Sequence, residues 1–241
     1  VGFINADDIY MLGYYADRFA QRGLVSLVMS NTYPTRVHVA GGIEGVLGTN
    51  PLAVGVPSSG PYPFVLDMAT STSAIGHVRI ASYTDEPIPT GIAIDTEGLE
   101  TTNAKSALSG GALTPMAGHK GSGLGLCVAL LSGPLIGATI GKALAEVFEN
   151  PQRSTGARGH LFVALDPAAF GDFDTFCTAV RVYLEEIKSS RRAAENDEIL
   201  IPGERGLRQR EDSLNHGAVI YESVWENTAK LAAELGLTMP A

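Results

Sequence analysis

The stretch LAVGVPSSGPYPFVLDMATS, residues 52–71, decides how the fold is interpreted. Two apolar runs, Leu52–Val56 and Phe64–Met68, have the length and composition of buried strands. The turn-rich segment Pro57–Pro63 separates them, and the polar segment Asp67–Ser71 follows the second run. Free backbone N–H groups and hydroxyls at such a position can hold a phosphate or a carboxylate. This stretch therefore predicts two strands followed by a candidate anion-binding segment.

Further helices and strands are expected on both sides of this stretch. Helical periodicity predicts helices, and short apolar runs between turn residues predict strands. Since the two types mix throughout, the class is α/β or α+β. We expect a core over residues 1–190 and, over 191–241, an extended segment and helix that pack back on the core or on a partner subunit. The predicted helices are 11–22, 70–81, 121–131, 173–188 and 224–235, and the predicted strands are 1–4, 24–29, 160–165 and 199–202.

The composition describes a globular protein rich in glycine. The 241 residues are 45% apolar and 18% charged, which excludes disorder for most of the chain. The 28 glycines exceed the ordinary share of about 7% without a collagen period, so they serve turns, close packing or backbone approach to a ligand. The net charge of −9, with no basic face, argues against nucleic acid as a partner.

Cysteine usage and hydropathy predict a cytoplasmic protein without a membrane span. Cys127 and Cys177 lie in apolar helical contexts outside any C-x-x-C pair, so buried reduced thiols are expected. The uncharged run Gly121–Gly141 is long enough for a span, but its glycines and Pro134 would break it. Two short buried helices are expected there instead.

The common nucleotide and catalytic motifs are absent. The sequence has no G-x-G-x-x-G, no phosphate-binding G-x-x-x-x-G-K-[ST], no G-x-S-x-G and no H-E-x-x-H. No metal site is expected, because the histidines lack metal-ligand spacing. The histidines are His38, His77, His119, His160 and His216.

Short polar segments at element ends are the remaining candidates. Lys120 stands at the start of an apolar helix, where a cation is unfavourable for the helix itself, so an anion-binding role is favoured over a solvated lysine. His119 has two interpretations, capping or ligand binding, and Asp67 has the same two. Residues 202–204 form either a plain turn or part of a site. Two hypotheses for the chain follow from these segments: an enzyme with an unusual nucleotide site, or a non-catalytic interaction domain. Tight cofactor binding would distinguish the enzyme from the interaction domain.

Six motifs, taken in order, resemble the type-2 malate/L-lactate dehydrogenase family, which also contains sulfolactate dehydrogenases and cyclic imino acid reductases. Each motif is weak alone, but together they cover the whole chain. They are GYYA (13–16), GTNPLA (48–53), FVLDMATS (64–71), GHKGSGL (118–124), HLFVALDP (160–167) and PGE (202–204).

The resemblance implies an oxidoreductase that uses NAD or NADP and acts on a small 2-hydroxy or 2-keto acid, or alternatively reduces a cyclic imino acid. It implies a non-Rossmann, mixed-sheet nicotinamide-binding α/β fold of the L-sulfolactate dehydrogenase-like type, and a homodimer. Thr49 would lie near the substrate. The residues implied to bind the cofactor are Thr32, Asp67, Met68, Ala69, Thr70, Ser71, His119, Lys120, Gly203 and Glu204.

The sequence departs from the family pattern in two respects. The family has a helical segment upstream that supplies part of the substrate site, whereas this chain begins after it, as a fragment, a processed chain or a truncated paralogue. A separate N-terminal polypeptide could complete the site. The family also reads N-S-x-H-[FI]-G where this chain has Asn5–Tyr10, so Asp8 stands at the acid/base histidine and Tyr10 at the glycine.

Asp8 has two interpretations. Oxidation of an alcohol needs a base for the hydroxyl proton; histidine, which titrates near pH 6.5, suits this better than an ordinary aspartate, which titrates near 3.9. Repulsion from Asp7 would make Asp8 a stronger base. Alternatively the pair caps the next helix, and the chain is a family-derived protein that has lost hydride transfer and does other chemistry or acts as a subunit.

Overall fold

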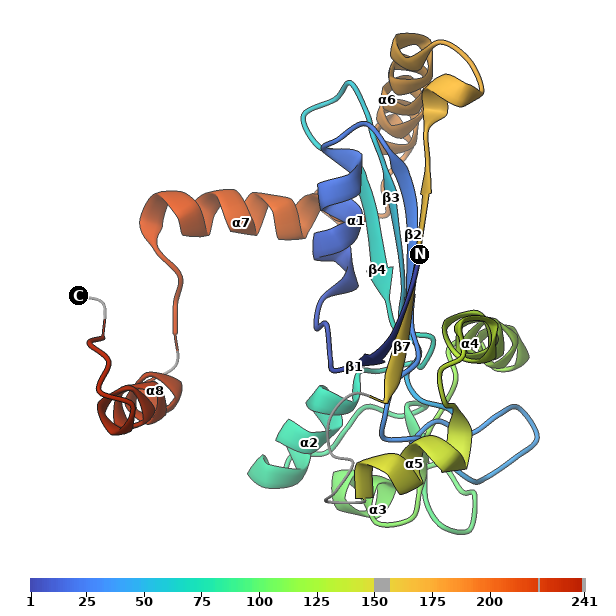
Figure 1. The fold of residues 1–241 in the computed structure, drawn as a ribbon, viewed down its shortest axis with the longest axis vertical. Helices are drawn as coiled ribbons and strands as arrows, with labels where there is room; N and C mark the ends of the chain where they lie inside the picture. Colours follow the sequence, from blue (N-terminus) through green and yellow to red (C-terminus); the bar gives the residue numbers. More distant parts are fainter. Residues whose placement is uncertain (150–156, 221, 240–241) are drawn as a thin grey trace. The chain divides into compact units, whose positions relative to one another are not determined.

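The structure, a computed structural model, describes residues 1–149, 157–220 and 222–239. Contacts divide the chain into a larger unit that ends at Gly203 and a smaller unit that begins at Glu204. The larger unit is built on a five-stranded sheet with the strand order β1-β7-β2-β3-β4 (Figure 1). Its strands are β1 (Gly2–Ala6), β2 (Val25–Ser30), β3 (Leu52–Val56), β4 (Phe64–Met68) and β7 (Arg158–Leu165).

Every pair of neighbouring strands in this sheet is antiparallel. Strands and helices mix as predicted, but the expectation of a mixed sheet is wrong. The reason lies in the connections: the short segment Pro57–Pro63 returns β4 directly beside β3, whereas a parallel neighbour needs a crossover of about a dozen residues or more. Within the described residues, parallel pairing occurs only at an isolated bridge between Val37 and Leu113.

Helix α1 (Leu12–Ala20) covers one face of the sheet (Figure 1). Its close approach requires Gly55 in β3, because a Cβ there would lie 2.3 Å from the carbonyl oxygen of Ala16. Burial of each larger aliphatic side chain beneath the helix stabilises the fold by about 1.5–3 kcal/mol. The apolar cluster consists of Leu12, Ala16, Val28, Ala53 and Val65.

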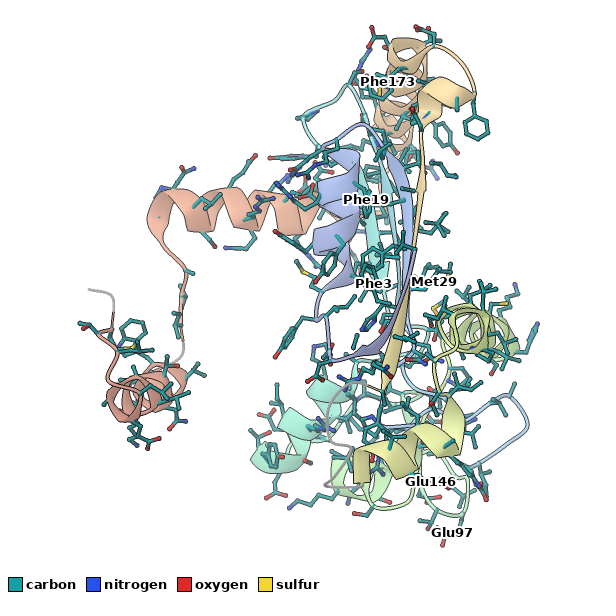
Figure 2. All side chains as sticks on the ribbon, viewed as in Figure 1. Phe3, Phe19, Met29, Glu97, Glu146 and Phe173 are labelled. Carbon is teal, nitrogen blue, oxygen red and sulfur yellow. The ribbon has the colours of Figure 1, made fainter. Side chains whose placement is uncertain are left out.

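Aromatic contacts tie the edge strand β1 and helix α1 to β7. The ring of Phe162 in β7 lies 5.4 Å from that of Phe3 and 6.4 Å from that of Phe19, measured between centroids. Figure 2 labels Phe3 and Phe19 beside the sheet, with Phe173 at its far end. The edge-to-face geometry of Phe3 on Phe162 is the favoured arrangement of two aromatic rings.

A second apolar core lies at one end of the sheet, where the helices α2 to α5 gather (Figure 1). The elements there are α2 (Ile75–Thr84), β5 (Ala93–Ile94), α3 (Ala104–Leu108), β6 (Ala112–Leu113), α4 (His119–Ser132), the 3₁₀ helix η1 (Pro134–Ile136) and α5 (Gly141–Glu149). The buried members of this core include Val37, Leu47, Val78, Ile88, Ile92, Leu113 and Ala129.

Most predicted elements are confirmed, with two corrections. The helix predicted over 70–81 begins only at Ile75, because Thr70 donates its N–H to the carbonyl of Thr49 (2.9 Å) and Ser71 pairs with Pro115. Residues 199–202 form no strand. The remaining described elements are η3 (Pro167–Ala169), α6 (Phe173–Ser189), α7 (Glu204–His216) and α8 (Glu222–Glu234).

The uncharged run breaks where its glycine and proline predict. Helix α4 ends at Ser132 and η1 begins at Pro134. In the part of the chain that the structure describes, no helix is long and apolar enough to cross a membrane. Both cysteines are free, and Cys177 is buried as predicted, but Cys127 is exposed because it lies on the outward face of α4.

Candidate functional site

The loop after β2 and the loop before β3 meet at a buried asparagine. Asn50 is 2% exposed; its Nδ2 donates to the carbonyl of Gly125 in α4 (3.0 Å), and its Oδ1 accepts the N–H of Thr32 (3.2 Å). Thr32 Oγ1 accepts the N–H of Asn50 (3.1 Å) and lies 3.3 Å from Thr49 Oγ1. Thr32 and Asn50 therefore brace each other and fix the position of the Thr49 hydroxyl.

The segment that follows β4 is tied to the same loop and to the start of α4. The hydroxyl of Thr70 donates to the carbonyls of Thr49 (3.0 Å) and Asn50 (3.1 Å). The carbonyl of Thr70 accepts the N–H of Met116 (3.0 Å), in the turn before α4. Met68 ends β4, Ala69 follows it, and Ser71 is buried beside Pro115. These contacts bring Thr32, Thr49, Thr70 and Ser71 together.

The N-terminus of α4 is open to an anion. The helix follows Ala117 (φ 48°) and Gly118 (φ 61°), has no side-chain cap and carries no acidic residue in its first turn. Apart from its chain neighbours, no atom of the described residues lies within 4 Å of where a Cβ on Gly118 would stand, and His119 and Lys120 are exposed beside it. The partial positive charge of the helix end and the lysine favour the same kind of ligand, a phosphate or a carboxylate.

Asp67 contacts a helix that sequence reasoning did not connect with it. Its Oδ2 accepts the N–H of Gly13 at 2.6 Å, so it caps the first turn of α1 rather than the helix that follows it. Burial raises the pKa of Asp67, and the hydrogen bond from Gly13 opposes that rise. The carboxylate of Asp67 therefore has a structural partner already.

Asp67→Ala is expected to lower the free energy of unfolding by about 1–2 kcal/mol, because the N–H of Gly13 loses its acceptor. Asp67→Asn keeps an acceptor oxygen and should lose less. Because burial raises the pKa of Asp67 in the folded state, the part of the stability that depends on its protonation is fully present below the ordinary value of 3.8 and is lost as pH rises through the raised pKa, whereas the ionised carboxylate still accepts the N–H of Gly13. Urea unfolding of both variants from acid to neutral pH checks this, and an unchanged alanine variant would contradict it.

Asp8 lies in a second polar cluster, where β1 ends against the start of β7. Its Oδ2 is 3.6 Å from Nη1 of Arg158, and the same nitrogen is 3.1 Å from Oδ1 of Asp7. Oδ1 of Asp8 accepts the N–H of Tyr10 at 2.9 Å. The N-cap residue of α1 is Met11, whose own side chain makes no capping hydrogen bond, and the carboxylate that accepts from the first turn belongs to Asp67. The acidic pair therefore does not cap the helix; Asp8 closes a turn ahead of it and faces an arginine.

A buried histidine holds this turn. His160 is 1% exposed, with Nδ1 2.9 Å from the Ser30 hydroxyl and Nε2 2.9 Å from the carbonyl oxygen of Asp7. Burial lowers the pKa of His160, which keeps the ring neutral. A carbonyl can only accept, so Nε2 carries the proton and Nδ1 accepts from Ser30. His160 thus fixes the backbone that presents Asp8.

The residues after β2 join the two clusters. Asn31 Oδ1 accepts the N–H of Gly159 beside His160 (2.7 Å), and the next residue, Thr32, belongs to the Asn50 cluster. Arg158 Nη2 donates to the carbonyl of Tyr33 (3.3 Å). Sequence reasoning missed four structural members of this site, and only Asn50 and His160 lay in motifs that could have signalled them. The four are Asn31, Asn50, Arg158 and His160.

A cavity of about 260 Å³ opens beside the Asn50 cluster. Asn31, Thr32 and Asn50 contribute its polar edge. Its other walls are largely aliphatic and come from the loop after β2 and from α4 and α5. In the described ranges no group of three His, Cys, Asp or Glu residues could hold a metal ion.

Gly203 and Glu204 are the last residues that the family resemblance implies for cofactor binding, and the boundary between the larger and the smaller unit falls between them. Gly203 (φ 92°) packs against β4, because a Cβ there would stand 2.8 Å from the carbonyl oxygen of Val65. Pro202 accepts the N–H of Val65 at 3.1 Å. Glu204 opens α7 in the smaller unit and pairs with Arg208.

Comparison with known proteins finds a dehydrogenase family and individual dehydrogenases that are similar to this chain. The family model for malate/L-lactate dehydrogenase matches residues 1–228. The malate dehydrogenase of Pyrococcus horikoshii is 37% identical over 240 residues, which are 97% of this chain and 65% of that protein. The L-sulfolactate dehydrogenase of Methanothermobacter thermautotrophicus is 36% identical over 239 residues, 99% of this chain and 67% of that protein. The chain spans about two thirds of the length of these relatives.

Solved structures agree with the sequence match. The sulfolactate dehydrogenase of Methanocaldococcus jannaschii has a TM-score of 0.86 at 34% identity and covers 99% of this chain and 67% of its own. The malate dehydrogenase of Entamoeba histolytica, at 24% identity, shares the fold with a TM-score of 0.93, covering 100% of this chain and 69% of its own. By its match to the family model over residues 1–228, the chain belongs to the malate/L-lactate dehydrogenase family.

Proposed function

We propose that the chain is an NAD(P)-dependent oxidoreductase that moves hydride between a nicotinamide and a small 2-hydroxy or 2-keto acid. The observation that carries the proposal is the continuous polar framework. It runs from the Asp8 turn, through His160 and residues 30–33, to the Asn50 cluster and the open N-terminus of α4. Family membership and the dehydrogenase relatives support the same reaction class.

The residues present fit a nicotinamide dinucleotide. The open space beside Gly118 and the uncapped start of α4 suit its pyrophosphate, with Lys120 and His119 alongside. The cavity beside Thr32 suits a flat ring with a carboxamide, since its walls are apolar and its edge is polar. When bound, the cofactor supplies or accepts the hydride. Backbone groups of Asp67–Ser71 and the Gly203–Glu204 turn complete the proposed binding residues.

Asp8 is proposed to handle the proton. In the oxidising direction it removes the hydroxyl proton of the substrate, and in the reducing direction it returns a proton to the carbonyl oxygen. Arg158 and the His160-held turn keep its carboxylate in place. The Thr49 hydroxyl, fixed by Thr32, is proposed to contact the substrate.

Lys120→Ala is expected to weaken the affinity for NADH and NADPH by about tenfold or more, because one cation at the helix start is removed. Lys230→Ala, which changes an exposed lysine of α8, is the matched control and should bind as the unchanged chain does. Fluorescence titration of both cofactors measures this. If the unchanged chain binds neither cofactor, the proposed function is wrong. If the unchanged chain binds and the Lys120→Ala variant binds equally well, Lys120 has no phosphate role.

Reduction of a cyclic imino acid is the second candidate. The observation in its favour is the 35% identity, over 89% of this chain, to the Δ1-pyrroline-2-carboxylate/Δ1-piperideine-2-carboxylate reductase of Pseudomonas syringae pv. tomato. Turnover with oxaloacetate, pyruvate and Δ1-piperideine-2-carboxylate, compared side by side, decides between them. Cofactor binding without turnover of any of these would favour a family member that has lost hydride transfer.

A cytoplasmic homodimer is also proposed. Helix α4 exposes a row of leucines, with Leu126 and Leu130 at 47% and 48% exposure and Leu131 next to them. Burial of this face in a second copy would remove apolar surface from water. Sedimentation equilibrium that gives only the mass of one chain would contradict this.

A further inference from the structure

A second cavity, of about 420 Å³, lies between α2 and α3. Three of its lining side chains are cationic, Arg36, Arg79 and Lys105, and none of the lining residues is a carboxylate. The hydroxyls of its polar wall belong to Tyr83, which is largely exposed, and to Ser82 and Ser109. The cavity therefore combines positive charge, hydroxyls and an aromatic face.

The three cations differ in how they are held. Arg36 is half-buried, and its Nη1 donates to the carbonyl of Leu108 (2.8 Å), which fixes the guanidinium at the wall. Lys105 pairs with Asp85, but both side chains are exposed, 61% and 75%, and such a pair contributes little, so the ammonium can turn to a stronger anion. In the described part of the chain the guanidinium of Arg79 has no ion pair.

The cavity is connected to the proposed cofactor site by the backbone. Ile75, the first residue of α2, lines it and follows closely after Ser71. The carbonyl of Arg36 accepts the N–H of Leu113 (2.7 Å), and the next residue, Thr114, accepts the N–H of Thr72 (2.9 Å). The cavity thus borders the same segment that is proposed to bind the dinucleotide.

We propose that this cavity binds the 2′-phosphate on the adenosine end of the cofactor, and that the chain therefore prefers NADP to NAD. The inference rests on the proposed function. In Rossmann-type sites a carboxylate faces the ribose 2′-hydroxyl of NAD and arginine faces the 2′-phosphate of NADP, and the same charge argument applies to a cavity on another fold. Two guanidiniums and an ammonium match a phosphate dianion, and the ring of Tyr83 offers a face for the adenine.

Calorimetric titration with adenosine 2′,5′-bisphosphate and with adenosine 5′-monophosphate tests the cavity without turnover. The bisphosphate is expected to bind at least tenfold more tightly, and to displace NADPH. Arg79→Ala is expected to remove most of that difference while the affinities for the monophosphate and for NADH stay unchanged. Arg191→Ala, an exposed arginine outside the cavity, is the control and should keep the tenfold preference. Arg79→Gln repeats the test with a longer neutral side chain.

The outcomes separate this inference from the proposed function. If NADPH and NADH bind equally, or if the Arg79 variants weaken both cofactors alike, the 2′-phosphate does not lie in this cavity, although the proposed function stands. If neither cofactor binds, both are overturned. A tenfold or larger loss confined to NADPH and the bisphosphate supports the assignment.

Discussion

Gly121→Ala is expected to lower the free energy of unfolding by about 2–3 kcal/mol and to weaken cofactor binding at the start of α4. The same substitution at Gly123, two residues on, is expected to stabilise the chain by about 0.5–1 kcal/mol. Both glycines lie in the same helix, so helix propensity favours alanine equally at the two positions. The opposite signs therefore come only from what surrounds each Cβ.

The surroundings of Gly121 are backbone atoms of a hydrogen-bonded turn. A Cβ there would stand 2.0 Å from the carbonyl oxygen of Met116 and 2.8 Å from its nitrogen, whereas a Cβ at Gly123 meets no described atom outside its own stretch of helix within 4 Å. Met116 is held by its N–H bond to Thr70 (3.0 Å), and the positive φ of Ala117 fixes the turn behind it. Relief of the clash must shift the turn, and with it the His119–Lys120 end of α4.

Chemical denaturation of the two variants beside the unchanged chain measures the effect, with NADPH titration as the second readout. Thermal unfolding gives the same comparison, because each kcal/mol moves the melting temperature of a chain of this size by about 2–4 °C. The melting temperature should be lower than that of the unchanged chain for Gly121→Ala and higher for Gly123→Ala. Equal stability at both positions would show that the turn at Met116 yields freely, and the role given to Gly121 would be wrong.

This pair also corrects the interpretation of the glycine excess. Composition left turns, internal packing and ligand approach open. At Gly48, Gly55 and Gly121 an added Cβ would come within 2.3 Å of protein backbone, so these glycines let the chain pack on itself. Gly118, at the start of α4 and with open space at its Cβ, is a position that fits approach to a ligand.

Sequence predicted the local elements well and the long-range contacts poorly. Strands β3 and β4 fall where their apolar runs and the intervening prolines place them, because length and turn residues are local signals. Strand direction and the partner of Asp67 are not local. The carboxylate meets Gly13, far away in the chain, and nothing in the spacing shows that. Asn50 was likewise visible only as one letter of a loop motif.

The helix predicted over residues 70–81 begins later than predicted, at Ile75, and the backbone contacts of Thr70 and Ser71 explain the difference. Thr70 and Ser71 are acceptable helix starters by composition. In the structure their backbone groups bond to the loops at Thr49 and Pro115, and the first turn is delayed to Ile75. The same bonds build the candidate site. The preference of Thr and Ser for helix starts therefore fails here, because the site requires a different backbone conformation.

Asp8→Asn is expected to lower kcat by about 100- to 10,000-fold if Asp8 transfers the proton, since the amide can neither take nor give one. The turn should survive, because an asparagine oxygen still accepts the N–H of Tyr10. Asp7→Asn is the matched control: it also loses a charge facing Arg158 and also keeps its backbone acceptor role toward residue 8, so it should retain most of the activity.

Asp8→His adds a readout that a purely structural role would not move. Histidine titrates near pH 6.5 in ordinary surroundings and must be neutral to act as a base. Beside the Arg158 guanidinium its charged form is disfavoured, so its pKa should fall somewhat below that value. The oxidation rate of this variant should therefore decline as pH drops through that range, a decline that the Asp8→Asn variant lacks. Equal kcat in the Asp8→Asn and Asp7→Asn variants would show that the carboxylate of Asp8 carries no proton, and the family-derived protein without hydride transfer would then be the better interpretation.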